Sequence, residues 1–360
     1  MKVLYADPLS HDTHKYYNIN NLKCLEGMCE LNTYFRQGYL DGYDKSNLTS
    51  YESALRGFPG LLTHLEKKNR LYYFLRSKIG QLRIVIDILK LAKKQNVDMI
   101  IFSSVDIIPF WFATLFSRQR IAFIEHSLWL AAERSWMRFF WRKLNHRIEM
   151  CVMEPQYFDF VRNQIRCMNP LYLVRHPVNE VVSEISAVNC CRDKRILIYA
   201  PSASNDREWI SSILKVQERI PDYIKLVVRG NEDFENSRIK VYSQPVEREV
   251  YEQYFRESEY ILIPYDTDFN YRVSGVLFDA VSRNKKILLK SGNMLSDYSE
   301  RYKHIFVEFD EIDDMLDKIH MQKNQHDESN QIKEFEQFRE NYSKAAIIDD
   351  FKRLLDGQAI

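Results

Sequence analysis

The segment from Glu259 to Lys290 most constrains the fold, because it sets a strand, a loop, a helix and a second strand in immediate succession. Residues 260–264 form a short apolar run that predicts a buried strand, and residues 276–283 show the period of an amphipathic helix. A second apolar run follows at 287–289. Parallel strands joined by a helix bind ligands beyond their carboxyl ends. The segment therefore predicts an α/β fold with a ligand site in the loop 265–275.

That loop ends in Ser274-Gly275, with Arg272 two residues upstream. A helix N-terminus offers unpaired N–H groups and partial positive charge, so this arrangement suits a phosphate. Ser is also a common N-cap, so an ordinary capped turn explains the same residues equally well. Both interpretations stay open on the spacing alone.

A family resemblance rests on the same residues. The run from Tyr271 to Val281, followed by Lys285-Lys286-Ile287-Leu288, resembles the nucleotide-binding segment of GT-B glycosyltransferases, especially the family 4-like group. That group carries two Glu separated by seven residues; Asp279 stands at the second position and Tyr271 at the first. The resemblance implies a GT-B fold, in which two Rossmann-like domains face each other across a cleft and the C-terminal helix crosses back to the first domain.

Strand and helix patterns alternate along the rest of the chain, which is long enough at 360 residues for two domains. The sequence Arg175-His176-Pro177-Val178 resembles the family's crossover between domains. We expect an acceptor-side domain at 1–178, a donor-binding domain at 179–335, and a C-terminal helix within 336–360 that packs back toward the first domain. One long charged helix is expected over 332–355.

The resemblance places the nucleotide-sugar donor against residues that follow the strands of the second domain. The turn after residues 195–200 holds Arg207, and the strand at 224–228 ends in Arg229-Gly230, where Gly would let the backbone approach a ligand closely. The expected donor-binding residues are Ser202, Arg207, Arg229, Gly230, Tyr265, Arg272, Val273, Ser274, Gly275 and Asp279. Asp279 would bind the ribose hydroxyls.

The first half offers candidates for acid–base chemistry at two strand ends. His126 follows the apolar strand 120–124, and a His with an ordinary pKa can exchange a proton near neutral pH. Glu125 would orient His126 or act as a base, and Asp7 follows the first strand. A purely structural His126 is the alternative. His11 and His14, in the loop after Asp7, are weaker candidates, either as metal ligands or as solvated loop residues.

Residues 128–147 are rich in aromatic side chains, and Arg134, Arg138 and Arg142 recur every four residues. This spacing predicts one amphipathic helix with an arginine face, which could lie in an anionic membrane interface. A core helix with a solvated edge fits as well. The membrane interpretation would suit a lipid-linked acceptor.

Composition excludes several classes. The formal net charge is +1, with 51 basic and 50 acidic residues, so no overall field favours nucleic acid as a partner. The six cysteines show no metal-ligand spacing and are read as reduced thiols: Cys24, Cys29, Cys151, Cys167, Cys190 and Cys191. With no signal peptide and no long apolar run, we expect a cytoplasmic protein, in peripheral contact with the inner face of the cell membrane if the arginine helix forms.

The resemblance implies a hexosyltransferase that uses a nucleotide-diphosphate sugar, with UDP favoured, retains configuration and needs no metal. The acceptor would be a saccharide or a lipid-linked molecule in surface polysaccharide or glycolipid biosynthesis. Two alternatives share the fold: a nucleotide-sugar 2-epimerase, and a binding subunit that has lost catalysis, as Tyr271 in the first Glu position suggests.

Overall fold

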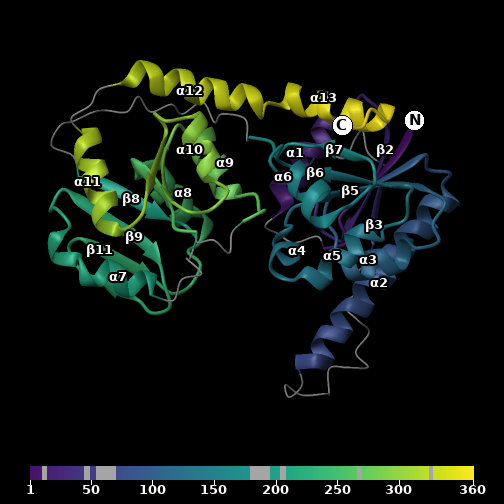
Figure 1. Ribbon diagram of the computed structural model, residues 1–360, viewed down its shortest axis with the longest axis horizontal. Helices are drawn as coiled ribbons and strands as arrows, with labels where there is room; N and C mark the ends of the chain where they lie inside the picture. The colour runs from purple at the N-terminus through teal and green to yellow at the C-terminus, as the bar shows by residue number, and fades with distance from the viewer. Residues whose placement is uncertain are drawn as a thin grey trace. The chain divides into compact units, whose positions relative to one another are not determined.

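The computed structural model describes residues 1–9, 14–43, 49–53, 70–178, 195–202, 208–265, 270–323 and 327–360. These residues form two compact units (Figure 1). Unit 1 comprises Met1–Pro177 and Lys344–Ile360, and unit 2 comprises Val178–Ser343. The expected divisions fell after residues 178 and 335, whereas the structure divides after Pro177 and Ser343.

Unit 1 is built on a parallel sheet of seven strands in the order β3-β2-β1-β4-β5-β6-β7. The strands are β1 (Lys2–Ala6), β2 (Glu30–Arg36), β3 (Thr49–Ser53), β4 (Met99–Phe102), β5 (Arg120–Glu125), β6 (Ile148–Val152) and β7 (Leu171–Leu173). The main helices are α1 (Lys15–Leu25), α2 (Arg70–Lys94), α3 (Ile107–Thr114) and the last helix, α13 (Lys344–Asp356). The central strands β1, β4 and β5 are mostly buried apolar runs, as expected of a sheet covered on both faces.

Unit 2 has a second seven-stranded sheet, in the order β10-β11-β9-β8-β12-β13-β14, in which only the short edge strand β10 (Phe234–Glu235) is antiparallel. The parallel strands are β8 (Ile196–Ala200), β9 (Ile224–Arg229), β11 (Ile239–Tyr242), β12 (Tyr260–Ile263), β13 (Lys286–Lys290) and β14 (Phe306–Phe309). The helices are α7 (Trp209–Lys215), α8 (Arg248–Glu257), α9 (Gly275–Ser282), α10 (Ser296–Arg301), α11 (Ile312–Lys323) and α12 (Glu328–Asn341).

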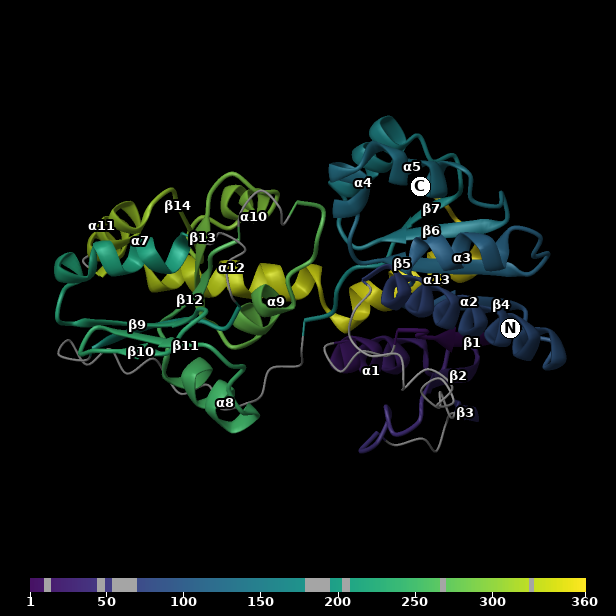
Figure 2. The same ribbon diagram turned by 90° about the horizontal axis from the view of Figure 1, so that it is seen from below.

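Alternation along the strands of unit 2 sends neighbouring side chains into two separate cores. Ile198 and Leu262 pack with helices α7 and α11 on one face of the sheet. Tyr199 and Ile261 pack with α8, α9 and α12 on the other face. Figure 2 shows these helices as layers on the two sides of the sheet. Because every parallel strand ends at the same edge, loops from distant parts of the sequence meet there.

The prediction of one helix over 128–147 is wrong. The chain forms α4 (Trp129–Glu133), a 3-10 turn η2 (Ser135–Met137) and α5 (Arg138–Arg142), and Arg134 between them is extended at φ −120° and ψ 99°. The break has a cause: Arg138 Nε donates to Ala131 O at 2.7 Å, and this bond caps the end of α4. Arg134, Arg138 and Arg142 therefore do not share one helical face.

The prediction of one terminal helix over 332–355 is also wrong, because the chain changes units there. Tyr342 ends α12 and stacks on Phe338 in the core of unit 2, with ring centroids 4.6 Å apart. Helix α13 then belongs to unit 1, where the buried Asp350 accepts from Arg175 Nε and Nη2 at 2.9 and 2.7 Å. The residues before and after the break are thus held by different cores.

Candidate functional site

The carboxyl edge of the sheet in unit 2 gathers most of the predicted donor-binding residues. Ser202 follows β8, Arg229 ends β9 and Tyr265 follows β12. Tyr265 donates its hydroxyl to Ser202 Oγ at 3.0 Å, and Asn293 Nδ2 donates to Tyr265 O at 3.0 Å. These bonds join the loops after three neighbouring strands, β8, β12 and β13. Arg207 lies outside the described residues.

The start of α9 has the geometry of a capped helix. Ser274 is extended and buried, and its Oγ accepts from Leu277 N at 3.3 Å, so the capping role that the sequence allowed is real. The first amides of the helix, those of Gly275 and Val276, donate to no partner in the described part of the chain. The capped start thus retains donors for a ligand.

Gly275 is exposed, and a Cβ built on it would meet nothing within 4 Å. Packing within the described chain therefore does not demand glycine here, whereas close approach of a ligand would. Just upstream, Tyr271 has a left-handed backbone at φ 59°, a conformation that is uncommon for a bulky residue and concentrates at functional sites. Val273 packs partly against the core, and Arg272, which lies between Tyr271 and Val273 in the sequence, is half-buried.

Gly230 has a different reason to be glycine from the one expected. A Cβ there would lie 2.6 Å from Val241 Cγ1 and 3.0 Å from Ile210 Cγ1. The missing side chain is thus explained by packing between β11 and α7, and close backbone approach to a ligand is not needed to account for it. Arg229, the residue before it, is half-buried at the end of β9.

Asp279 lies half-buried in α9, and its Oδ2 accepts from the Tyr251 hydroxyl of α8 at 3.2 Å. This contact fixes one carboxylate oxygen. A carboxylate has further lone pairs with which to accept from a sugar diol. Its assignment to the ribose stays a prediction.

In unit 1, the predicted acid–base residues lie at the carboxyl edge of the sheet, where Asp7 and Glu125 are buried and His126 is half-buried. Asp7 is fully buried, and its carboxylate accepts from Leu9 N at 2.9 Å, Asn18 Nδ2 at 2.8 Å and Ser104 Oγ at 2.5 Å. These donors tie the loop after β1 to α1 and to the end of β4. Asp7 thus organises this edge whether or not it touches a substrate.

His126 is held in one tautomer. Its Nε2 lies 2.6 Å from Ser103 O, which can only accept, so Nε2 carries the proton and Nδ1 keeps its lone pair. The ring stacks on His14 at 4.7 Å between centroids and meets Tyr17 edge-on at 4.8 Å. Burial, and then the neighbouring His14, lower the pKa of His126 well below its ordinary value. The imidazole is therefore neutral, and its Nδ1 can accept a hydrogen bond but is a weaker base than that of an ordinary His.

Glu125 does not orient His126, contrary to one expectation. Its Oε1 accepts from Ser127 N at 3.0 Å, and its Oε2 accepts from Trp141 Nε1 at 2.9 Å. Burial raises the pKa of this carboxyl to about 7. The carboxyl points toward the buried Trp141, and His126 is positioned instead by Ser103, His14 and Tyr17.

Two residues at this edge were not predicted for the site. The Tyr17 ring lies 5.1 Å from that of His176, and burial lowers the pKa of His176 to about 4. Tyr17 lies within a helical pattern that does not distinguish it from its neighbours, and the sequence indicates a role for His176 only in the crossover between domains. His14 joins the cluster, and His11 lies outside the described residues.

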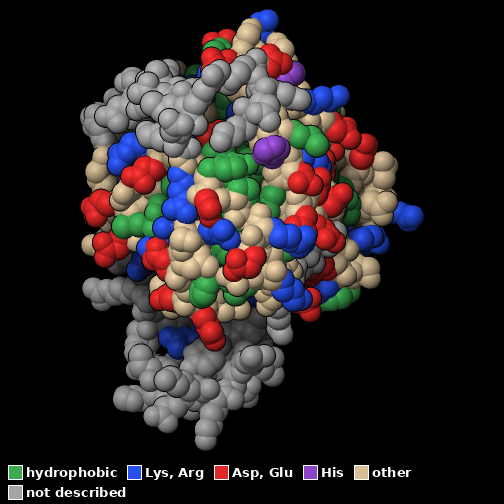
Figure 3. Space-filling model, turned by 90° about the vertical axis from the view of Figure 1, so that its left-hand side faces the viewer, with side chains coloured by type: hydrophobic (Ala, Val, Ile, Leu, Met, Phe, Trp, Pro, Cys, Tyr) green, Lys and Arg blue, Asp and Glu red, His purple; other side chains and the backbone are tan. Residues whose placement is uncertain are grey.

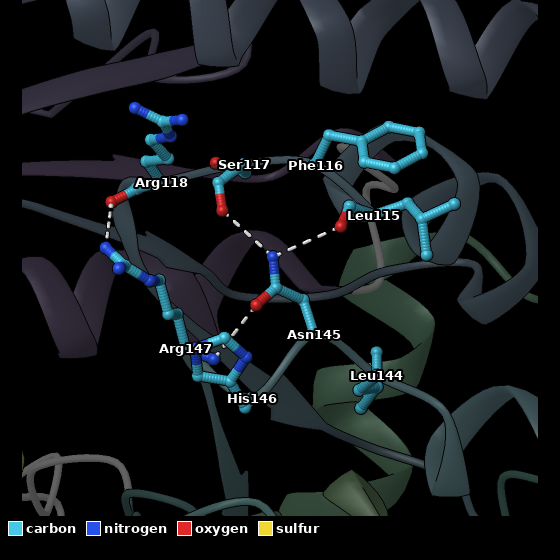
Figure 4. A pocket seen from close by; sticks show the side chains of 8 residues that line it. All are labelled: Leu115, Phe116, Ser117, Arg118, Leu144, Asn145, His146 and Arg147. Atoms are coloured by element: carbon cyan, nitrogen blue, oxygen red, sulfur yellow. Dashed lines mark hydrogen bonds between the residues drawn. The ribbon is translucent and has the colours of Figure 1, made fainter.

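One surface hollow, of about 450 Å³, lies elsewhere on unit 1. Figure 4 shows it between the loops that precede β5 and β6, where the Asn145 amide donates to Leu115 O at 3.3 Å and Ser117 O at 2.9 Å. These loops are at the amino ends of the strands, and none of the predicted site residues lines the hollow.

The described residues contain neither a metal-binding cluster nor a membrane-spanning helix. No cluster of three or more His, Cys, Asp or Glu side chains in this part of the chain is placed to hold a metal ion. No described helix is long and apolar enough to span a membrane.

Comparison with known proteins identifies the fold. No family model and no curated protein matches the chain. Among solved structures, sucrose-phosphate synthase from Thermosynechococcus elongatus aligns at a TM-score of 0.68 with 11% identity, covering 99% of both chains. The Anabaena protein HepE in complex with UDP aligns at 0.65 with 10% identity over 99% of this chain and 100% of its own. A glycosyltransferase from Rickettsia africae aligns at 0.64 with 10% identity over 98% and 97%.

These alignments span nearly the whole chain, and they show that it has the GT-B fold, with one Rossmann-like sheet in each unit. At such low identity the likeness establishes the fold and leaves the activity to be argued from the site.

Proposed function

We propose that the protein is a glycosyltransferase that takes a sugar from a nucleotide-diphosphate donor, with UDP as the favoured nucleotide. The observation that carries this proposal is the capped but open start of α9, with Gly275 exposed and Arg272 upstream, at the carboxyl edge of a parallel sheet. The similarity of the fold to a protein solved with UDP bound supports the choice of nucleotide.

Transfer of the sugar requires hydrogen-bond donors and cations at the position where negative charge develops. When the bond to the anomeric carbon breaks, charge develops on the departing diphosphate, and fixed N–H groups and cations stabilise it. Arg229, Arg272 and the amides of Gly275 and Val276 would supply these interactions, together with Arg207 and Ser202. Asp279 would accept hydrogen bonds from the ribose diol.

On the acceptor side, His126 Nδ1 would accept a hydrogen bond from a hydroxyl, since Nε2 is bonded to Ser103 and the lowered pKa of the ring disfavours full protonation. Asp7 would act through the loop that it holds. Retention of configuration remains our proposal from the resemblance, with Tyr271 replacing the first Glu of the pair.

For the pathway, we place the enzyme in surface polysaccharide or glycolipid assembly, where the acceptor is a saccharide or a lipid-linked molecule. A cytoplasmic enzyme in contact with the inner membrane face would meet such an acceptor. Metal is not required in this proposal, because Arg229 and Arg272 would neutralise the diphosphate in place of a divalent ion.

The direct test is a thermal-shift titration with UDP, GDP, CDP and TDP, since a ligand that binds only the folded state raises the melting temperature. UDP is expected to give the largest shift. Gly275→Ala should leave the unliganded melting temperature unchanged or slightly higher, because its Cβ meets no neighbour, while it reduces the shift by UDP. No shift with any nucleotide, or an equal shift in Gly275→Ala, would remove the proposed site.

A binding subunit without catalysis is the second candidate, favoured by Tyr271 in place of an acidic residue and by its left-handed backbone. Such a protein would bind UDP as proposed but would release no free UDP from a UDP-sugar with any acceptor. Measuring UDP release with candidate saccharide and lipid-linked acceptors separates the two.

A further inference from the structure

Five aromatic side chains from two segments of unit 1 form one cluster, named here the aromatic patch: Trp111, Phe112, Trp136, Phe139 and Phe140. Trp111 and Phe112 lie on α3, and the other three lie on η2 and α5. Phe112 and Trp136 are each 57% exposed, and Phe139 is 47% exposed. Several large aromatic side chains exposed together mark an interaction site, because a solvated surface rarely holds them.

The rings of the aromatic patch pack edge to face on one another. Phe140 meets Trp111 at 5.7 Å and 79°, Trp136 at 6.2 Å and 74°, and Phe139 at 5.6 Å and 85°. Trp111 Nε1 also donates to Lys143 O at 2.7 Å and so fixes α3 to the end of α5. The patch is therefore a preorganised surface, and its rings already cover parts of one another's faces.

The same two segments are strongly basic. Residues 107–118 and 129–147 contain six Lys and Arg side chains and a single acidic one, Glu133. The six, named here the basic rim, are Arg118, Arg134, Arg138, Arg142, Lys143 and Arg147. Among the described residues none of them forms an ion pair with Asp or Glu, and Arg142 Nε instead donates to Ile165 O at 3.1 Å.

The hollow in Figure 4 extends this surface. Arg118 and Arg147 line it, joined by a bond from Arg147 Nη1 to Arg118 O at 3.3 Å, and Phe116 at its side is 89% exposed. Unit 2, in contrast, includes surface cations that are paired with acidic side chains, such as Arg238 with Asp222 at 2.8 Å and Lys225 with Glu235 at 3.2 Å. The face in Figure 3 accordingly mixes Lys and Arg with Asp and Glu.

We propose that the aromatic patch and its basic rim dock unit 1 on an anionic lipid surface. Trp and Phe side chains partition into the boundary between headgroups and acyl chains, and Lys and Arg are attracted to anionic headgroups. The arrangement reaches this chemistry without the single helix that the sequence predicted, because two short segments present the side chains together.

Two other occupants fit less well. A second copy of the chain would bring the basic rim against itself, and like charges would oppose pairing through this face. Single-stranded nucleic acid needs aromatic faces open to stack bases, whereas these rings pack edge to face with one another. A bilayer needs only an apolar surface with cations around it.

The docking surface depends on the proposed function only for the reason why the protein would bind a membrane, which would be access to a lipid-linked acceptor. Docking and nucleotide binding are measured separately. A protein that binds vesicles without binding UDP would contradict the proposed function alone, and one that binds UDP but not vesicles would contradict the docking surface alone.

The test is sedimentation of the full chain with phosphatidylcholine vesicles, with and without phosphatidylserine. We expect binding to the anionic vesicles and little to the neutral ones. Trp136→Ala with Phe139→Ala should weaken that binding about tenfold, since both exposed side chains lose their insertion. Arg134→Glu with Lys143→Glu should weaken it by at least about tenfold, and more at low salt.

Matched controls lie on unit 2. Phe234→Ala removes an aromatic side chain that is 38% exposed, and Lys215→Glu with Lys303→Glu reverses two exposed charges. These controls should bind vesicles like the parent. Equal binding by the parent and both patch variants would overturn the proposal. So would a parent that ignores vesicles but binds a single-stranded oligonucleotide, or one that dimerises through Trp136 and Phe139.

Discussion

In both units, parallel strands end at one carboxyl edge of the sheet, but the side chains at the two edges differ. Carboxyl and imidazole groups line the edge in unit 1, whereas cationic side chains and helix amides line the edge in unit 2. In unit 1 the edge is enclosed: Asp7 is fully buried, His126 is packed between rings, and burial shifts the pKa of Glu125 upward and that of His176 downward. In unit 2 the edge carries the half-buried Arg229 and Arg272, and Gly275 at the start of α9 is exposed.

The buried titratable groups of unit 1 and the half-exposed cations of unit 2 suit different chemical tasks. Groups removed from water exchange protons at shifted pH values and hold fixed tautomers, which suits the handling of a hydroxyl. Half-exposed cations and helix amides suit an anion that must enter and leave. In the function we propose, the edge in unit 1 would handle the acceptor hydroxyl and the edge in unit 2 would bind the anionic donor.

The largest expected effect is on folding and follows from Asp7. Asp7→Ala should lower the free energy of unfolding by about 3–5 kcal/mol, because it leaves the buried donors of Asn18, Ser104 and Leu9 without their acceptor. Urea denaturation measures this. Asp279→Ala, which loses the 3.2 Å bond from the half-buried Tyr251 hydroxyl, should cost about 1 kcal/mol. Equal losses at the two sites would erase the contrast between the edges.

Acid should destabilise unit 1 through its buried histidines. The pKa of His176 is about 4 in the folded protein and near 6.5 when unfolded, so the unfolded state binds the proton more readily. The free energy of unfolding should therefore fall as pH is lowered from 6.5 toward 4, by up to roughly 3 kcal/mol for this group. His126 acts in the same direction.

Glu125 opposes this trend. Its pKa is raised to about 7 by burial, so lowering the pH from 7 toward 4.5 favours the folded state, which takes up the proton first. Unfolding measured at about pH 7.5 and about pH 5 should show less acid sensitivity in His176→Phe and more in Glu125→Gln than in the parent. His14, Tyr17 and Asp7 face the same cluster and stay unchanged in both variants. Identical pH profiles for all three proteins would mean that these groups are hydrated.

In unit 2 the expected effect is on binding instead of folding. Arg272→Ala should weaken UDP binding by about 1.5–3 kcal/mol, the range for a charge-assisted hydrogen bond. Arg219→Ala is the matched control, because Arg219 precedes β9 at the opposite edge, is 62% exposed and pairs with Asp313 at 2.8 Å. Calorimetric titration measures both. An affinity loss in the control as large as in Arg272→Ala would mean that the effect is not local to α9.

Most of the fold was predictable because it depends on local pattern. Strands such as β4 and β12 are apolar runs that must be buried, and the strand–helix alternation fixes a parallel sheet. The two wrong helices share a cause that no local pattern reveals. Arg138 turns back to bond Ala131 O at the end of α4, and Tyr342 packs into the core of unit 2, so contacts made only in the folded chain decide where each helix ends.

The candidate site was predictable where strand ends decide it. Asp7, Glu125, His126 and Arg229 all lie at carboxyl ends of strands, as the apolar runs before them indicate. The partners of His126 were not predictable, since Tyr17 comes from a helix and meets it only in the folded unit. Gly230 shows the same limit, because Val241 and Ile210, whose packing requires glycine there, are distant from it in the sequence and adjacent only in the folded unit.

The smallest expected effect is that of removing divalent ions. UDP binding should survive EDTA, because the unit 2 edge brings guanidinium groups, amides and hydroxyls, whereas Mg²⁺ selects carboxylate and carbonyl oxygens. Titrating UDP with EDTA and then with Mg²⁺ measures this, with Arg272→Ala run in parallel. Loss in EDTA and recovery with Mg²⁺ would contradict the metal-free proposal and the anion-binding role of the unit 2 edge. If Arg272→Ala alone gained affinity from Mg²⁺, the ion would be replacing the missing cation, and the contrast between the edges would hold.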